Sequence, residues 1–163
     1  METASTLPIE YLAQAGIENV AFEAASASLS EAHWDEIMAD LSAIGNRLDN
    51  WDGEGAKAPS PALWESAVEL GKTLRSLGQD PPSSVYAGPN GTVLFDWQND
   101  FDYFDIEVVE PFRARWMRVI PGQQAKHGAL QIGRSQGNSS KGWVADSWID
   151  AQVITLRPIL SSV

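Results

Sequence analysis

The fold of this chain is decided by the stretch Asn50-Trp51-Asp52-Gly53-Glu54-Gly55-Ala56, which continues as Lys57-Ala58-Pro59-Ser60-Pro61. The stretch separates two segments whose apolar residues recur at helical spacing. Its glycines allow backbone conformations that are closed to other residues, and its tryptophan can be buried from a loop. Ser60 suits the N-cap of a helix, and Pro61 suits the first helical position. We therefore predict a packed junction between two helices.

The segment before the junction carries a helical pattern. Ser28-Leu29-Ser30-Glu31 matches a capping box, in which a hydroxyl precedes a glutamate by three residues. We therefore expect a helix that begins near Ser28 or Ser30 and ends before Asp49. Its apolar stripe consists of residues three or four positions apart, namely Trp34, Ile37, Met38, Leu41, Ile44 and Leu48.

The segment after the junction is amphipathic as well. A helix is expected from Ser60 to about Leu77, because Gly78 suits a helix C-cap and Pro81-Pro82 cannot continue a helix. Two amphipathic helices joined by a structured junction are expected to pack as neighbours. The apolar face of this second helix consists of Leu63, Ala67, Val68, Leu70, Gly71, Leu74 and Leu77.

The hydrophobic pattern then changes from helical spacing to alternation. Gly88-Pro89-Asn90-Gly91 predicts a tight turn, since Asn-Gly tolerates the positive φ that a hairpin demands. Short turns between the strands favour an antiparallel meander. The predicted fold class is α+β, with two amphipathic helices packed on an antiparallel four- or five-stranded sheet. Strands are predicted at 84–87, 92–97, 103–108 and 113–120, with a fifth at 129–132 after a loop at 121–127.

At 163 residues the chain is expected to form one domain with an additional arm. Residues 1–27 are interpreted as an N-terminal arm, in which alternation predicts a short strand at 17–22 and small polar residues predict a connector at 23–28. Residues 28–163 are interpreted as a single α+β domain. It comprises a helical pair at 28–78, a β-meander at 84–120 and a C-terminal extension at 121–163, in which residues 133–142 read as a mobile loop.

Charge and composition exclude several classes of function. The chain has 11 Lys and Arg residues against 22 Asp and Glu residues, a net charge of -11, and no basic face for direct binding of nucleic-acid phosphates. Because it lacks cysteine, it has no disulfide, no thiolate catalyst and no cysteine-based metal site. Its start shows no secretory signal, and no apolar run is long enough to cross a membrane. We expect a cytoplasmic protein with no membrane partner and no direct nucleic-acid partner.

Three marks carry a resemblance to other proteins. They are the junction Trp51-Asp52-Gly53-Glu54-Gly55-Ala56, the strand entry Pro81-Pro82-Ser83-Ser84-Val85, and the hairpin Gly88-Pro89-Asn90-Gly91 that leads into Phe95-Asp96-Trp97. Over residues 45–110 the chain resembles a set of small uncharacterised bacterial and phage proteins that share these marks, the second of them in the form Pro-Pro-x-Val, from which this chain departs by one extra residue. The resemblance implies a prokaryotic or phage origin and the order of two helices followed by strands. It implies no activity.

The junction also has the spacing of an incomplete calcium loop. Asn50, Asp52 and Glu54 alternate and Gly55 follows, as at positions 1, 3, 5 and 6 of such a loop. The closing bidentate acid would fall at Pro61, which cannot bind a cation. We therefore interpret Asp52 as a turn residue that bonds backbone amides, and we predict no metal site and no cofactor.

Acidic side chains are dense around the predicted third strand. Paired carboxylates serve glycosidases, so a small hydrolase that uses this acidic strand face is an alternative function. Alternation, however, places Asp105 and Glu107 together with Asp96 on the sheet face away from the helices, where solvation or pairing with Arg113 or Arg115 is expected. His33 and His127 have no partner at a telling spacing, so we interpret them as surface residues and predict no catalytic residue. The acids are Asp100, Asp102, Asp105, Glu107 and Glu110.

Seven tryptophans exceed what a core of this size usually needs, and exposed tryptophan is enriched at protein interfaces. Trp143 and Trp148 follow a glycine-rich segment that contains Arg134, so these three residues are predicted to contact a partner. Asp102, Asp105 and Glu107 are predicted to contribute from the acidic face.

The predicted function is that of a non-catalytic, acidic protein-binding module whose partner is another protein with a basic surface. An inhibitor, antitoxin or immunity factor in host–phage conflict fits this description, including an anti-CRISPR-like inhibitor or one that mimics nucleic-acid phosphates. A mimic requires carboxylates lined along one surface. Besides the hydrolase, the other alternative is a structural subunit of a larger complex, which a large exposed apolar patch would favour.

Overall fold

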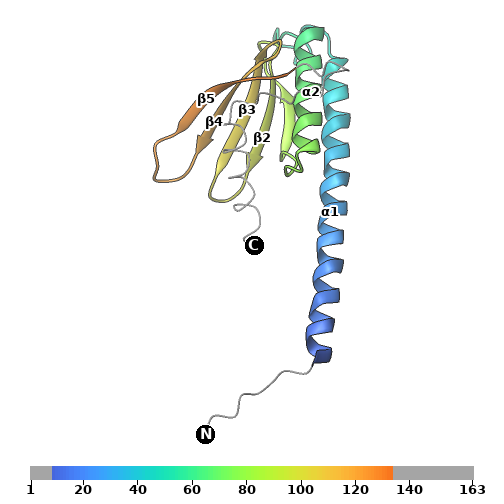
Figure 1. Ribbon diagram of the computed structural model, residues 1–163. Coiled ribbons are helices and arrows are strands. Elements are labelled where there is room, and N and C mark those ends of the chain that lie inside the picture. The colour runs from blue at the N-terminus through green and yellow to red at the C-terminus, as the bar shows by residue number, and fades with distance from the viewer. Residues whose placement is uncertain (1–8, 134–163) are drawn as a thin grey trace. The chain divides into compact units, whose positions relative to one another are not determined.

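A computed structural model describes the backbone of residues 9–133 and the side chains of residues 23–133. The two helices and the five-stranded antiparallel sheet in this range confirm the predicted α+β fold. The chain divides within its first helix into two compact units, residues 1–33 and residues 34–163. The elements are α1 (Ile9–Gly45), α2 (Pro61–Ser76), β1 (Ser84–Ala87), β2 (Val93–Gln98), β3 (Tyr103–Glu110), β4 (Arg113–Val119) and β5 (Lys126–Gln131) (Figure 1).

In the first unit, the described residues 9–33 are helical throughout. The predicted strand at 17–22 and the predicted connector at 23–28 are therefore wrong, and the expected helix start near Ser28 lies inside α1. Ile17, Val20 and Ala21 are spaced by three and four residues, so the residues that alternate also satisfy a helical period. Alanine and glutamate, which favour helix, are frequent around them, and their propensity decides between the two periods.

In the second unit, α1 and α2 pack against each other through the predicted stripes. Trp34 and Leu41 of α1 are buried in one core cluster with Leu70 of α2. The two helices approach closely beside Gly45, where an added Cβ atom would lie 2.5 Å from the Trp64 ring. The Trp64 Nε1–H donates a hydrogen bond of 2.7 Å to the Leu41 carbonyl, so the ring joins the helices by packing and by a polar contact.

The two ends of α2 follow the predicted caps, whereas α1 ends earlier than predicted. The Ser60 Oγ accepts a hydrogen bond of 3.3 Å from the Leu63 N–H at the start of α2. Gly78, just past the end of α2, takes a φ of 67°, a conformation that suits glycine. α1 ends at Gly45, so Leu48 lies beyond the helix and is 80% exposed, and its predicted place in the apolar stripe is wrong.

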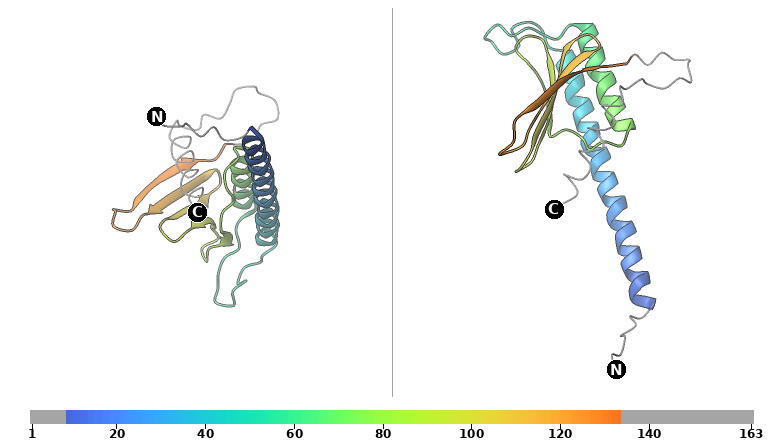
Figure 2. Two further views of the ribbon diagram at one scale, coloured as in Figure 1. Left: turned by 90° about the horizontal axis from the view of Figure 1, so that it is seen from below. Right: turned by 60° about the vertical axis from the view of Figure 1, so that its left-hand side comes forward.

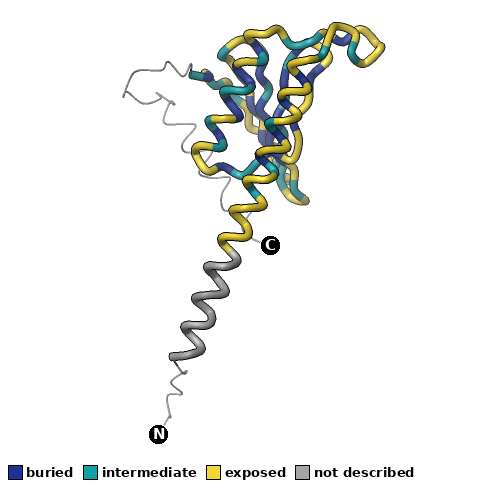
Figure 3. The backbone as a smooth tube through the Cα atoms, turned by 90° about the vertical axis from the view of Figure 1, so that its right-hand side faces the viewer, coloured by how far each residue is buried: buried dark blue, intermediate teal, exposed yellow. Residues whose placement is uncertain are grey.

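The five strands form one antiparallel meander in the order β1-β2-β3-β4-β5 (Figure 2). The register places Phe95 opposite Ile106, and Ile106 opposite Trp116, and all three side chains belong to the core cluster that contains the helix stripes. Buried residues alternate with exposed or half-buried ones along β1, β2 and β4, so one face of the sheet meets the core (Figure 3). β5 begins at Lys126, so the predicted loop at 121–127 extends too far and the fifth strand is longer than predicted.

The junction is a hydrogen-bonded turn. Asp52 Oδ1 accepts hydrogen bonds from the backbone N–H groups of Glu54 and Ala56, at 2.9 and 3.0 Å, and these bonds hold the pKa of Asp52 below its usual value. Asn50 has a φ of 66°, and its Oδ1 accepts a hydrogen bond from Gly55 N–H at 2.7 Å. The carboxylate is thus used within the loop, which supports the interpretation as a turn. Among the described residues, no group of three His, Cys, Asp or Glu side chains is arranged to hold a metal ion.

The junction also holds the β1–β2 hairpin. The Lys57 N–H donates a hydrogen bond of 2.9 Å to the Pro89 carbonyl, and Lys57 forms an isolated parallel bridge with Asn90. Gly91 has a φ of 78°, and a Cβ atom there would lie 3.0 Å from the Ala58 carbonyl oxygen. Two of the three sequence marks, the junction and the hairpin, therefore form one contact that sets the position of the turn between β1 and β2.

Candidate functional site

The sheet face opposite the core is the candidate site, and we call it the outer face. The register aligns its side chains in rows that cross the strands. Tyr86, Met117 and Val119 on this face are 40%, 37% and 36% exposed, so the face is partly open to solvent. The first row consists of Tyr86, Leu94, Glu107, Arg115 and Ala129, the second of Ser84, Asp96, Asp105, Met117 and His127, and the third of Gln98, Tyr103 and Val119.

Two carboxylates face each other in the second row. Asp96 of β2 lies directly opposite Asp105 of β3. Like charges in opposed positions destabilise a sheet. The Ser84 hydroxyl donates a hydrogen bond to Asp96 Oδ1, but no lysine or arginine among the described residues forms an ion pair with either carboxylate. The pair is therefore a negative site that the described residues leave uncompensated.

The surroundings of Asp105 disfavour its charged form. The residue is only 9% exposed, and burial raises the pKa of its carboxyl above the usual value. The charges of Glu107 and Asp96 raise the pKa of Asp105 further, while hydrogen bonds from Tyr103 and from the Met117 backbone oppose the rise. Burial and the Asp105 charge in turn raise the pKa of the Tyr103 phenol. A positive charge placed beside Asp105 would favour its ionised form.

Aromatic and apolar side chains surround the acidic pair. Tyr103 lies two residues before Asp105 on β3, and Met117 of β4 lies directly opposite Asp105. We call Tyr86, Asp96, Tyr103, Asp105 and Met117 the central patch. The patch combines packing area with uncompensated negative charge, and this combination suits contact with another protein.

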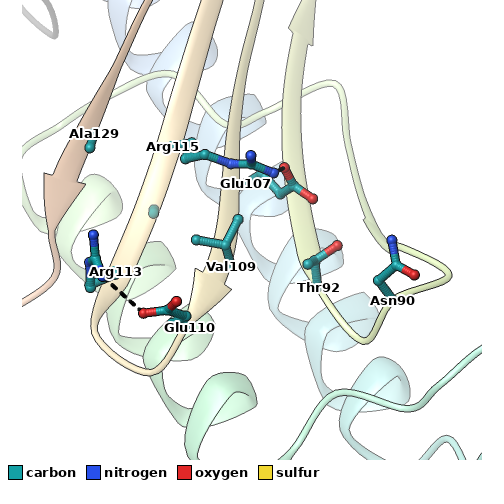
Figure 4. Close-up of a pocket in the computed structure, with 9 residues that line it drawn as sticks. Asn90, Thr92, Glu107, Val109, Glu110, Arg113, Arg115 and Ala129 are labelled. Atoms are coloured by element: carbon teal, nitrogen blue, oxygen red, sulfur yellow. Dashed lines mark hydrogen bonds and ion pairs between the residues drawn. The ribbon is translucent and has the colours of Figure 1, made fainter.

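A hollow of about 500 Å³ lies beside the central patch, at the end of the outer face where the β1–β2 hairpin turns (Figure 4). Two ion pairs line it. Arg115 Nη2 lies 2.6 Å from Glu107 Oε2, and Arg113 Nη1 lies 3.0 Å from Glu110 Oε2. The predicted pairing of the acidic face with the arginines of β4 is thereby confirmed for Glu107. The lining residues are Asn90, Thr92, Glu107, Val109, Glu110, Arg113, Ala114, Arg115 and Ala129.

The hollow lies beside an irregularity in the pairing of β3 with β4. The pairing of β3 with β4 shifts between Val108 and Glu110, so Val109 has no directly opposed partner on β4. Such a bulge bends the strand and redirects its side chains, and bulges are frequent beside functional sites. The small side chain of Ala129 leaves further space. The hollow thus depends on one irregularity in an otherwise regular meander.

The structure places the predicted contact residues in different surroundings. Asp105 and Glu107 lie on the outer face as expected. Asp102 is instead buried in a two-pronged ion pair with Arg118, in which Arg118 Nη2 lies 2.6 Å and Nε 3.0 Å from Asp102 Oδ2. The side chains of this pair are 8% and 10% exposed, and Arg118 already compensates the charge of Asp102, which leaves Asp102 no charge to offer a partner. Arg134, Trp143 and Trp148 lie outside the described residues.

The tryptophans of the described residues have structural roles. Trp34 and Trp97 donate indole hydrogen bonds of 2.9 and 3.0 Å to the carbonyls of Gln79 and Asp80, and so tie the α2–β1 connection to the core. Trp51 donates to the Lys57 carbonyl at 3.2 Å within the junction. Burial and these backbone contacts make Trp34 and Trp97 residues of the core and Trp51 a residue of the junction, as the sequence pattern predicts.

The sequence pattern places Asp96 on this face but does not show that Tyr86, Tyr103 and Met117 belong to the same surface. Alternation assigns each of them to a face, but only the strand register shows that they are neighbours. No family model, no curated protein and no solved structure matches the chain, so the resemblance stays a prediction. Within the described residues, no helix has the length and apolar character needed to cross a membrane.

Proposed function

We propose that this chain is a non-catalytic protein-binding module whose outer face contacts a basic surface of another protein. One observation carries the proposal: Asp96 and Asp105 face each other without a cation among the described residues. Two unpaired carboxylates in opposed positions lower the stability of the sheet. A lysine or arginine of a partner placed between them would offset this repulsion in the complex.

The side chains around the acidic pair support a protein as the partner. Tyrosine and methionine offer apolar area at an interface, and Tyr86 and Met117 are both exposed. The acidic net charge of -11 favours encounter with a basic surface at long range. The central patch would then supply the short-range contacts once the two proteins meet.

The biological role we propose is that of an inhibitor, antitoxin or immunity factor of bacterial or phage origin that acts in the cytoplasm. The carboxylates of the outer face favour a compact contact over imitation of a phosphate backbone, because Glu107 is already paired with Arg115. A hydrolase would need a water-excluding pocket around two acids. Asp96 and Asp105 lie on a partly open sheet face and do not line the hollow, so the geometry supports binding better than catalysis.

Site-specific photo-crosslinking in the native host tests this proposal. A photo-reactive amino acid placed at Tyr86 or Met117 is expected to yield a crosslink to one protein with a basic surface. The control position is Lys72, an exposed residue of α2. Crosslinks from the outer face alone would support the proposal, and crosslinks from Lys72 alone would assign the contact to the helical side and refute it.

A further inference from the structure

The hollow differs in charge from the central patch beside it. In the Glu107–Arg115 pair, the carboxylate side chain is 25% exposed and the arginine side chain is 66% exposed, so the guanidinium is the group that faces solvent. In the second pair, Arg113 and Glu110 are similarly exposed, at 61% and 59%. The two pairs together are neutral, but on a chain with a net charge of -11 the β4 wall of the hollow exposes two guanidinium groups to solvent.

Both guanidinium groups retain hydrogen-bond donors. Arg115 contacts Glu107 through Nη2, and Arg113 contacts Glu110 through Nη1. A guanidinium carries five N–H donors in a planar fork that matches a carboxylate. Since each arginine uses one nitrogen in its ion pair, the remaining donors can bind an added carboxylate without breaking either pair.

The opposite wall of the hollow supplies neutral polar groups. Figure 4 shows Asn90 and Thr92 across the hollow from Arg113 and Arg115. The Asn90 amide and the Thr92 hydroxyl form no hydrogen bond to another of the described residues. Val109 lies between the two walls and provides an apolar surface. A ligand with a carboxylate on a short aliphatic stem would match this arrangement.

We propose that the hollow binds an acidic side chain, Asp or Glu, of the partner segment whose basic residues contact the central patch. This inference rests on the proposed protein-binding function. The row of Asp105 and the row of Arg115 are two residues apart along the strands, about 7 Å. The partner segment therefore carries an acidic residue next to a basic one, and opposite charges on the two surfaces set its register on the outer face.

The inference can be tested with small probes and without the partner. The full-length chain, labelled with ¹⁵N, is titrated at constant ionic strength with N-acetyl-glutamate α-amide, which carries the side-chain carboxylate alone. Saturable shifts are expected for the Arg113 and Arg115 Nε–H signals and for the Thr92 backbone amide. N-acetyl-glutamine α-amide has the same shape without the charge and is expected to give no saturable shift.

Matched variants identify the groups that bind. R113Q/R115Q is expected to weaken binding of the glutamate probe by about tenfold or more, the factor for losing one charge-assisted hydrogen bond. K72Q, a control on the exposed side of α2, is expected to leave binding unchanged. E107Q releases Arg115 from its ion pair and is expected to strengthen binding of the glutamate probe. E65Q on α2 removes the same charge far from the hollow and is expected to leave binding unchanged.

Three results would overturn the inference. They are equal binding of the glutamine probe, tighter binding of N-acetyl-glycine, whose carboxylate represents a chain terminus, and linear shifts spread over the whole chain. R113K/R115K keeps both charges but loses the planar forks, so full binding by this variant would also contradict a guanidinium site. These readouts need no partner, so their failure leaves the crosslinking test of the proposed function intact.

Discussion

Asp105 connects the stability of the sheet with the proposed function at the scale of one residue. It is buried on the outer face, lies opposite Asp96, and has no cationic partner among the described residues. A residue in such surroundings lowers the stability of the free protein while it favours a complex that supplies a positive charge. Asp52 shows the contrasting case, because its carboxylate accepts two backbone hydrogen bonds and its pKa is lowered.

The substitution D105N is predicted to stabilise the free protein at pH 7. Because the folded-state pKa of Asp105 is raised, the folded protein binds a proton at a higher pH than the unfolded chain does. The stability contributed by this group therefore rises as the pH falls through the folded pKa toward the usual value, and it declines with increasing pH. Urea unfolding should show the advantage of D105N at pH 7 and a smaller advantage near pH 4.

A matched control separates this local effect from net charge. D40N removes the same charge from an exposed position on α1 and should change the free energy of unfolding by no more than about 0.5 kcal/mol. If D105N unfolded at a lower urea concentration than the wild-type protein at pH 7, Asp105 would be a stabilising residue and its assignment as an uncompensated charge would be wrong.

At the scale of elements, the end of α1 distinguishes two leucines that the sequence pattern treats alike. Leu41 is fully buried, while Leu48 lies beyond Gly45 and is 80% exposed. L41A is predicted to lower the free energy of unfolding by about 2–5 kcal/mol, as for other large-to-small changes in a core. L48A should change it by about 0.5 kcal/mol or less. Thermal or urea unfolding measures both, and similar losses for the two variants would contradict the observed helix end.

The sequence predicted those elements whose local signals agree. Ser60 and Gly78 mark α2 at both ends, and the Gly88–Gly91 turn marks the β1–β2 hairpin, so these boundaries were placed within a few residues. The predicted start of α1 near Ser28 was wrong because the capping-box pattern at Ser28 lies inside the helix. Helix-favouring residues precede it and extend the helix back to Ile9. The prediction that Leu48 belongs to the apolar stripe of α1 was wrong because periodicity does not show where the helix ends. α1 ends at Gly45, against which the Trp64 ring lies.

The candidate site was only partly predictable for a related reason. Alternation assigned Asp105 and Glu107 to the outer face, but it left open whether they are solvated or paired with Arg113 or Arg115, and the structure shows the pair of Glu107 with Arg115. The burial of Asp102 depends on its contact with Arg118, 16 residues later, which no local pattern shows. The hollow depends on the bulge at Val109, a register shift that alternation cannot place.

At the scale of the whole molecule, the distribution of charge matters more than its total. The net charge of -11 acts at long range and is screened by salt over about 10 Å at 0.1 M. The Asp96–Asp105 pair acts at short range, and beside it Arg113 and Arg115 of β4 are paired with glutamates but keep their guanidinium groups exposed. A basic partner with a single acidic contact would fit this distribution, whereas a uniformly basic one would meet the arginines unfavourably.

The most direct measurement is the affinity of the purified partner for D96N/D105N, compared with that for the control E36Q/D40N, which removes two charges from exposed positions on α1. We expect D96N/D105N to weaken binding by at least about tenfold, mainly through faster dissociation, and the control to change it by less than about threefold. Equal losses for the two variants would show that only net charge attracts the partner. Unchanged affinity of D96N/D105N would contradict binding through the outer face.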